Sequence, residues 1–156
     1  MDQTIQNRLA ELQISLPQPP KPSGSYIPAS VAGNLLFCSG QVPRVNGVVQ
    51  YEGKMGEDGT MENAYAAARI CAINCLAAIE AAVGLEQVEK IVKVNGYVNT
   101  APGFRSTPKC INGASDLILA VFGDRGRHAR SAVGVQTLPD NAIVEIEMIV
   151  LLKEEA

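Results

Sequence analysis

The sequence predicts an α+β fold, a two-layer sandwich in which two helices pack on one face of a mixed sheet. Its segments follow in the order strand, strand, strand, helix, strand, helix, strand, strand, which favours one sheet covered by helices. The Ala-rich run over 61–84 is long enough for a helix that ends at Gly84. In the last segment, 143–152, alternate residues form one apolar face, namely Val144, Ile146, Met148 and Val150. We expect this face to pack on the helices.

The N-terminal part, residues 1–25, is predicted to be a helix and a connector that precede one domain of residues 26–156. With 156 residues, 47% of them apolar and 19% charged, the chain has the composition of a globular protein with a sizeable core. Ile5, Leu9 and Leu12 recur at helical spacing, which indicates a short amphipathic helix. The next segment, PQPPKPSG, holds four prolines and predicts an extended connector.

Local signals predict the elements between the connector and the long helix. Residues 34–43 form a strand candidate that Pro43 stops. In the segment 44–51, Asn46-Gly47 lies between apolar residues, which is the strongest short signal for a hairpin.

Alternation predicts a strand over 88–100, followed by a helix over 107–122 that Gly123 closes. One face of this strand carries Val92, Val94 and Val98, and the other carries Lys93, Asn95, Tyr97 and Asn99. Two further strands are predicted over 130–136 and 143–152, joined by a turn at 138–141.

The second face of the predicted sheet is mixed rather than plainly polar. It combines charged residues with apolar or small ones, which we assign as Tyr97, Arg130, Ala132, Gly134, Ile143, Glu145, Glu147 and Ile149. Such a face is unusual in open solvent, and symmetric assembly is the common way to cover it. We therefore expect an oligomer interface that contains polar pockets.

Charge and composition argue against several classes of protein. The net charge of −3 gives no general attraction to phosphate backbones, so a nucleic-acid partner would need a local basic patch. The sequence lacks the pattern of an export signal or a long uncharged apolar stretch, so we expect no membrane association. Four scattered cysteines and one histidine do not form a zinc set, and we expect neither a metal nor a cofactor. Free cysteines of this kind predict a reducing, cytoplasmic environment.

Two stretches, GNLLFCSGQVP and ARSAVGVQTLPDNAIVEIEM, closely resemble the YjgF/RidA family, also labelled endoribonuclease L-PSP. The resemblance extends from about Tyr26 to Leu152. It implies a chorismate-mutase-like fold and a homotrimer with sites at the subunit interfaces. It also implies hydrolysis of reactive enamine and imine acids, of the 2-aminoacrylate/2-iminopropionate type, to 2-keto acids and ammonia. We expect the N-terminal segment to lie outside such a trimer, so that deleting residues 1–20 leaves activity largely intact.

The resemblance implies that Arg130 binds the carboxylate of the substrate, which a planar guanidinium can grip through two parallel hydrogen bonds. It assigns Glu145 to the water that attacks the imine, and Glu147, two residues on, is the rival for this role. The other residues that it places in the pocket are Tyr26, Ser39, Gly40, Asn112 and Ala132. Ser115 is the alternative to Asn112. Ala132 stands where many members have cysteine, which excludes a thiol nucleophile here.

Arg130 and Glu145 cannot be direct partners across one hairpin. A tight turn at 138–141 would place Arg130 opposite about Ile149, well over about 10 Å from Glu145. The site therefore combines neighbouring subunits or uses a bent strand. The other basic residues of this region, Arg125, Arg127 and His128, are expected in a polar loop outside the site.

Two other functions remain open. The same arginine pocket could bind a keto acid without catalysis, as a sensor or regulator. A ribonuclease or translation inhibitor is less favoured, because the chain is acidic, has few aromatic residues and lacks a histidine pair or metal set.

Overall fold

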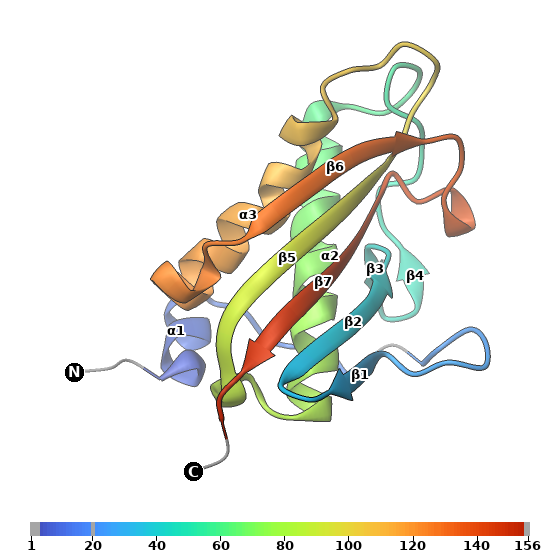
Figure 1. Cartoon of the computed structure of the whole chain (residues 1–156). Coiled ribbons are helices and arrows are strands. Elements are labelled where there is room, and N and C mark those ends of the chain that lie inside the picture. The colour runs from blue at the N-terminus through green and yellow to red at the C-terminus, as the bar shows by residue number, and fades with distance from the viewer. Residues whose placement is uncertain (1–3, 20, 155–156) are drawn as a thin grey trace.

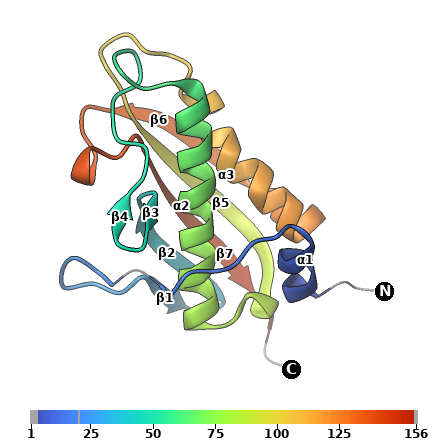
Figure 2. The ribbon, with the colours of Figure 1, turned by 180° about the vertical axis from the view of Figure 1, so that it is seen from behind.

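A five-stranded sheet carries the helices on one face in the computed structural model, which describes residues 4–19 and 21–154 (Figure 1). The strand order is β1-β2-β7-β5-β6, with bounds Ala29–Ala32, Leu35–Gln41, Val144–Leu152, Val88–Asn99 and Ala129–Val135. The helices α2 (Met61–Ala82) and α3 (Thr107–Phe122) lie side by side on one face of the sheet, which Figure 2 shows from the helix side. The predicted α+β two-layer fold is confirmed.

The sheet is mixed, because β5 and β6 are parallel while the other neighbours are antiparallel. α3 makes the crossover between the two parallel strands. The predicted hairpin is present as β3 (Arg44–Val45) and β4 (Val48–Val49). Its turn holds Asn46 at φ 51° and Gly47 at φ 82°, the left-handed conformations that this residue pair tolerates.

α2 begins at a capping residue, and its backbone packs closely against that of α3. Thr60 caps α2 by accepting a hydrogen bond from the backbone of Asn63 at 3.1 Å. A Cβ atom at Gly113 of α3 would lie only 2.0 Å from the carbonyl oxygen of Tyr65 in α2. The two helix backbones therefore touch at Gly113, which only glycine permits.

The expected hairpin between the last two strands was wrong, since β5 lies between β6 and β7. Arg130 is aligned with Val94, and Val94 with Met148 on the other side. Neighbours aligned in this way point to the same face, and Val94 and Met148 are buried against the helices. Arg130 therefore lies on the helix side of the sheet, not on its open face.

The open face differs from the expectation at further positions. Ala132 is aligned with buried Ile146 through Gly96, so it also faces the helices. Ile143 is fully buried, and its amide donates to the carbonyl oxygen of Tyr51 at 3.2 Å. The strand β1 was not predicted from the sequence. The open face presents Phe37, Val92, Tyr97, Ser131, Val133, Glu145, Glu147 and Ile149.

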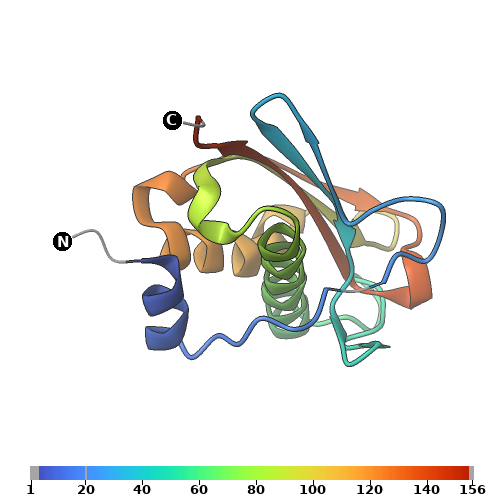
Figure 3. The same cartoon turned by 90° about the horizontal axis from the view of Figure 1, so that it is seen from below.

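The N-terminal helix α1 (Ile5–Glu11) is part of the hydrophobic core. Ile5 and Leu9 are buried, and the Arg8 guanidinium donates to the carbonyl oxygen of Ala120 at the end of α3 at 2.8 Å. The amide of Ile5 donates to a Glu86 carboxylate oxygen at 2.8 Å. After α1 the chain crosses α2 on the side away from the sheet (Figure 3).

α2 is the one described helix whose length and composition would suffice to cross a membrane. In this fold, 61% of the apolar stretch of α2 that passes this test is buried within the protein. The apolar character of α2 is thus explained by its place between the sheet, α3 and the connector.

Candidate functional site

The carboxylate of Glu145 in β7 lies against the backbone of Gly40 at the end of β2. A Cβ atom at position 40 would come within 2.1 Å of Glu145 Oε1, so the carboxylate occupies the space that any other side chain would fill. The pairing of β2 with β7 is irregular between Cys38 and Gln41, which places Gly40 in a bulge. This local irregularity makes room for the carboxylate.

Glu145 is an acid with an unusual setting. Partial burial, and secondarily the nearby charge of Glu147, raise the pKa of Glu145 above its usual value. Within residues 4–19 and 21–154, no side chain forms a hydrogen bond or ion pair with its carboxylate. A carboxylate with a raised pKa and open acceptor positions is suited to take a proton from water.

The carboxylate of Glu147 already accepts hydrogen bonds from neighbouring side chains. Its Oε1 accepts hydrogen bonds from Asn95 Nδ2 at 3.0 Å and from Tyr97 Oη at 2.7 Å. The hydrogen bond to Glu147 raises the pKa of Tyr97 to about 12. This arrangement favours Glu145 over Glu147 as the acid that handles water.

A cavity of about 620 Å³ opens at Glu145 and Gly40. This volume falls in the range of sites for small molecules, roughly 300–1,000 Å³. Part of its wall is the proline-rich connector, and the hairpin β3–β4 closes another side. The lining residues are Pro17, Gln18, Pro19, Lys21, Pro22, Ser23, Tyr26, Pro28, Gly40, Gln41, Val42, Arg44, Asn46, Gly47, Asn74, Pro139 and Glu145.

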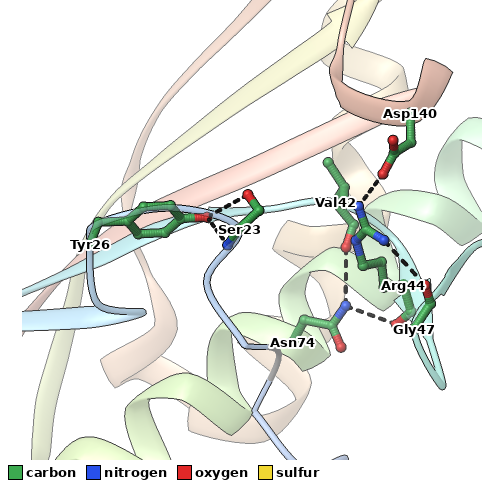
Figure 4. A network of polar contacts seen from close by, with 7 residues as sticks. All are labelled: Ser23, Tyr26, Val42, Arg44, Gly47, Asn74 and Asp140. Carbon is green, nitrogen blue, oxygen red and sulfur yellow. Dashed lines mark hydrogen bonds and ion pairs between the residues drawn. The ribbon is translucent and has the colours of Figure 1, made fainter.

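Tyr26 lines this cavity, whereas Ser39, the neighbour of Gly40, is not among its lining residues. Tyr26 is 51% exposed, and its hydroxyl lies 3.4 Å from both the amide and the hydroxyl of Ser23 (Figure 4). The Ser39 hydroxyl donates to the carbonyl oxygen of Ile27 at 2.7 Å. Tyr26 thus remains open to a ligand, whereas the proton of Ser39 is used within the chain.

Asn74 is a cavity residue that the sequence analysis missed. Its side chain is 1% exposed, and its Nδ2 donates to the carbonyl oxygens of Val42 at 3.1 Å and Arg44 at 3.0 Å. Arg44 also pairs with Asp140 and donates to Gly47, so one network supports the hairpin (Figure 4). An asparagine on the buried face of an Ala-rich helix was the signal that could have identified it.

Arg130 is held by neutral acceptors from α3. One terminal nitrogen donates to Asn112 Oδ1 at 2.9 Å and to Ser115 Oγ at 3.1 Å, and the other donates to the carbonyl oxygen of Pro108 at 3.1 Å. Both alternatives from the sequence, Asn112 and Ser115, therefore contact the guanidinium. None of the ion pairs in the described part of the chain involves Arg130, so its charge is not neutralised by a carboxylate.

Ala132 follows two residues after Arg130 and contributes backbone only. Its carbonyl oxygen accepts a hydrogen bond from the Thr107 hydroxyl at 3.0 Å. This bond ties the first turn of α3 to β6, and thereby fixes the distance between Arg130 and the helix that supplies its acceptors.

Within one chain, the structure brings together two separate groups rather than one site. Glu145, Gly40 and Tyr26 line the cavity, while Arg130 and Asn112 lie at the outer edge of the sheet. β5 separates the two strands that carry Glu145 and Arg130, and the alignment places them three residues apart on opposite faces. At about 3.3 Å per residue and 4.8 Å per strand, the two residues are more than roughly 10 Å apart.

Residues 6–152 match the family model described as "YjgF/chorismate mutase-like, putative endoribonuclease". The chain belongs to the YjgF family. Protein TCP17 of Trypanosoma cruzi is 42% identical over 146 residues, covering 92% of this chain and 91% of that protein. The 2-iminobutanoate/2-iminopropanoate deaminase of Dermatophagoides farinae is 32% identical over 143 residues, covering 90% and 95%.

A solved structure gives the same YjgF fold. The Agrobacterium tumefaciens protein Atu1372, described as of unknown function, is 42% identical and superposes with a TM-score of 0.88. The match covers 96% of this chain and 93% of that one. The match to the family model begins at residue 6, within α1, so it includes the N-terminal connector as well as the sheet and helices.

Proposed function

We propose that this YjgF protein hydrolyses reactive 2-imino and 2-enamine acids to 2-keto acids and ammonia. The observation that carries the proposal is Glu145, an unpartnered carboxylate with a raised pKa that lies over Gly40 in a cavity of small-molecule size. The likeness to a 2-iminobutanoate/2-iminopropanoate deaminase supports the same reaction class. Substrates of the 2-aminoacrylate/2-iminopropionate type fit this chemistry.

Arg130 and Glu145 have complementary roles in this reaction. The guanidinium of Arg130 binds the substrate carboxylate through two hydrogen bonds and fixes the plane of the adjacent C=N group. Water bonds to the imine carbon and gives one proton to Glu145. With the imine nitrogen protonated at the start, Glu145 returns this proton to the amino nitrogen of the tetrahedral intermediate. The C–N bond then breaks as the hydroxyl group gives its remaining proton to Glu145 and the C=O bond forms, and Glu145 passes that proton to the departing ammonia, which leaves as ammonium. No cofactor is needed for this sequence of steps.

We propose a homotrimer with sites between subunits, which the separation of these two residues supports. Because Arg130 and Glu145 lie on opposite faces of one sheet, a single chain cannot present both to one small acid. The open face carries exposed apolar side chains, with Phe37 43% and Val133 48% exposed. A neighbouring subunit that covers this face would supply its Arg130 edge to the Glu145 cavity.

The cavity supports substrates with a substantial side chain. With the carboxylate at Arg130, the rest of the acid extends toward Glu145 and the connector, where about 620 Å³ is open.

The buried, free cysteines Cys38, Cys71, Cys75 and Cys110 are consistent with a reducing compartment, and we place the reaction in the cytoplasm.

The test is hydrolysis of freshly generated imines. An amino-acid oxidase produces imines from a panel of amino acids, and semicarbazide traps the fraction that has not been hydrolysed. Wild type should lower trapping, whereas Arg130→Ala and Glu145→Gln should not. Arg105→Ala, at an exposed arginine outside the candidate site, and Glu147→Gln are matched controls. Light scattering reports the oligomeric state of each variant.

A binding protein without catalysis is the second candidate, because the Arg130 clamp needs no help from Glu145 to hold a carboxylate. Calorimetry with pyruvate and 2-ketobutyrate separates the two functions. If wild type binds these acids in an Arg130-dependent way but hydrolyses no imine in the panel, the hydrolase proposal fails and the binding function replaces it.

A further inference from the structure

A chain of hydrogen bonds connects Arg130 to the histidine of this protein. Arg130 donates to Ser115 Oγ at 3.1 Å, and Ser115 Oγ lies 2.9 Å from His128 Nε2. His128 Nδ1 lies 2.6 Å from the carbonyl oxygen of Gly126. The imine chemistry proposed above does not use Ser115 or His128.

The atom types fix the direction of every bond in this chain. A carbonyl oxygen only accepts, so Nδ1 of His128 carries the hydrogen that is donated to Gly126. In the neutral imidazole, Nε2 is then an acceptor and receives the hydroxyl hydrogen of Ser115. The guanidinium of Arg130 can only donate, and it donates to a lone pair of the Ser115 oxygen. With the imidazole neutral, each hydrogen bond from Arg130 to Gly126 therefore has one defined donor and one defined acceptor.

The surroundings keep His128 neutral. Burial is the main cause that lowers its pKa, the hydrogen bond to Gly126 acts in the opposite direction, and the positive charge of Arg130 lowers the pKa further. No described carboxylate is available to stabilise the imidazolium, because the nearby Asp124 forms an ion pair with Arg127 at 3.0 Å.

Two other ionisable groups of the neighbouring elements are engaged with other partners. On α3, Asp116 accepts a hydrogen bond from Tyr65 at 2.7 Å. In the turn before β6, Arg125 donates to the carbonyl oxygen of Val88 at 2.9 Å. The hydrogen bond between His128 and Ser115 is therefore the contact through which the imidazole acts on the arginine.

We infer that His128 is a positioning residue for Arg130, holding the Ser115 hydroxyl so that its lone pair faces the guanidinium. An arginine side chain has many rotamers, and restricting it to one lowers the entropy lost when a carboxylate binds. Arg130 borders an open hollow that Ser115, Leu119, Arg127 and His128 also line, so a carboxylate can reach the guanidinium there. The inference rests on the proposed function only for the carboxylate as ligand.

Nitrogen NMR of the imidazole tests the geometry without any enzyme assay. The sequence has one histidine, so a tag-free, ¹⁵N-histidine-labelled protein gives one assignable pair of ring nitrogens. We expect the tautomer with hydrogen on Nδ1 and a pKa below that of free histidine. Added pyruvate should raise this pKa, because its carboxylate offsets the charge of Arg130. A hydrogen on Nε2, or a pKa that does not respond to saturating pyruvate, would overturn the inference.

Kinetics and binding test the positioning role. His128→Leu removes the acceptor for Ser115, whereas His128→Gln keeps a side-chain carbonyl that can accept the same hydrogen. Loss of one such hydrogen bond should raise the KM for imines and the Kd for pyruvate about fivefold in His128→Leu, with kcat nearly unchanged. His128→Gln should recover most of this loss. Equal effects of the two variants, or a change in kcat alone, would contradict the positioning role.

The two readouts separate this inference from the proposed function. If wild type hydrolyses imines and His128→Leu leaves both KM and Kd unchanged, the inference fails while the function stands. If wild type hydrolyses nothing but binds pyruvate with a His128-dependent Kd, the function fails while the inference stands. Light scattering and the melting temperature of both variants check that assembly and folding are intact.

Discussion

The Glu145 carboxylate and the backbone of Gly40 share one small volume, so that a side chain at position 40 and the observed position of Glu145 exclude each other. The contact joins β2 to β7 at the irregular end of their pairing. It places an acid with a raised pKa at a cavity wall rather than in the solvent.

Gly40→Ala should therefore abolish most activity without unfolding the protein. The added methyl group meets the end of a flexible side chain, so Glu145 can move away at little cost in stability. We expect imine hydrolysis to fall at least about tenfold, since the general base is displaced, while the melting temperature changes little. Gly24→Ala, whose Cβ would make only ordinary contacts, is the control. Full activity of Gly40→Ala would argue against a role for Glu145.

Glu145→Gln and Glu147→Gln should have different effects. Removing a general base lowers kcat by about 100-fold or more, which we expect only for Glu145→Gln. Glu147→Gln should instead bring the pKa of Tyr97 down from about 12, because the charged acceptor of its hydrogen bond is lost. Steady-state kinetics and an ultraviolet titration of the tyrosines measure the two effects. A larger loss of kcat in Glu147→Gln would reverse the assignment.

The raised pKa of Glu145 predicts that the charged carboxylate, which the proposed reaction needs, lowers the stability of the folded protein at neutral pH. A carboxyl whose folded pKa exceeds its unfolded value contributes stability that is complete below the unfolded pKa and is lost as the pH rises through the folded pKa. At neutral pH the charged Glu145 is thus destabilising, and Glu145→Gln should raise the melting temperature. The gain should vanish well below about pH 4, where both forms are neutral. Thermal unfolding across this pH range measures it, and an equal gain at every pH would exclude the charge as the cause.

Removal of residues 1–20 should destabilise the protein, a cost that the expectation from sequence, which concerned activity alone, did not include. Ile5 and Leu9 are buried in the core, and each contributes about 1.5–3 kcal/mol by its burial. The deletion also removes Pro17 and Pro19 from the cavity wall. Denaturant unfolding should show the loss, and the imine panel should show a changed preference for the side chain. Leu9→Ala, which leaves the wall intact, separates stability from preference. An unchanged denaturation midpoint would contradict this view of α1.

A charge on the open face of the sheet should prevent assembly. Val133 is 48% exposed there, and Val133→Glu would place a carboxylate within the proposed interface. We expect light scattering to show monomers, and imine hydrolysis to be lost because Arg130 and Glu145 no longer meet. Val48→Glu, at a 63% exposed position on the β3–β4 hairpin, is the control. An active monomer of Val133→Glu would refute a site shared between subunits.

Local patterns were sufficient for most elements and insufficient for one pairing. The long Ala-rich helix and the Asn46-Gly47 hairpin were predicted correctly, because each depends on residues that are close in sequence. β6 and β7 were expected to pair because a turn-like segment joins them. Only the whole topology reveals that β5 inserts between them. Arg130 and Ala132 were also assigned to the wrong face, because alternation along a strand does not tell which of its two faces meets the helices.

The resemblance to a family allowed several residues of the candidate site to be predicted from the sequence. The residues that hold those side chains in place could not be predicted in this way. Asn112 and Ser115 looked like alternatives, yet three residues on a helix bring both to the same side, where both bind Arg130. Asn74 and the connector were missed because they approach Glu145 only through the folded chain. Contacts between residues far apart in the sequence leave no recognisable pattern in the sequence near either residue.

Gly113, where α3 rests on the carbonyl oxygen of Tyr65, lies between Asn112 and Ser115 along the chain. The absence of a side chain at that position sets the distance of α3 from α2, and with it the positions of Asn112 and Ser115, the two side chains that accept hydrogen bonds from Arg130. Gly113, which contacts no ligand, thus determines the position of the residues that hold the carboxylate-binding Arg130. Sequence change at Gly113 would alter affinity by shifting a whole helix, even with every contacting residue preserved.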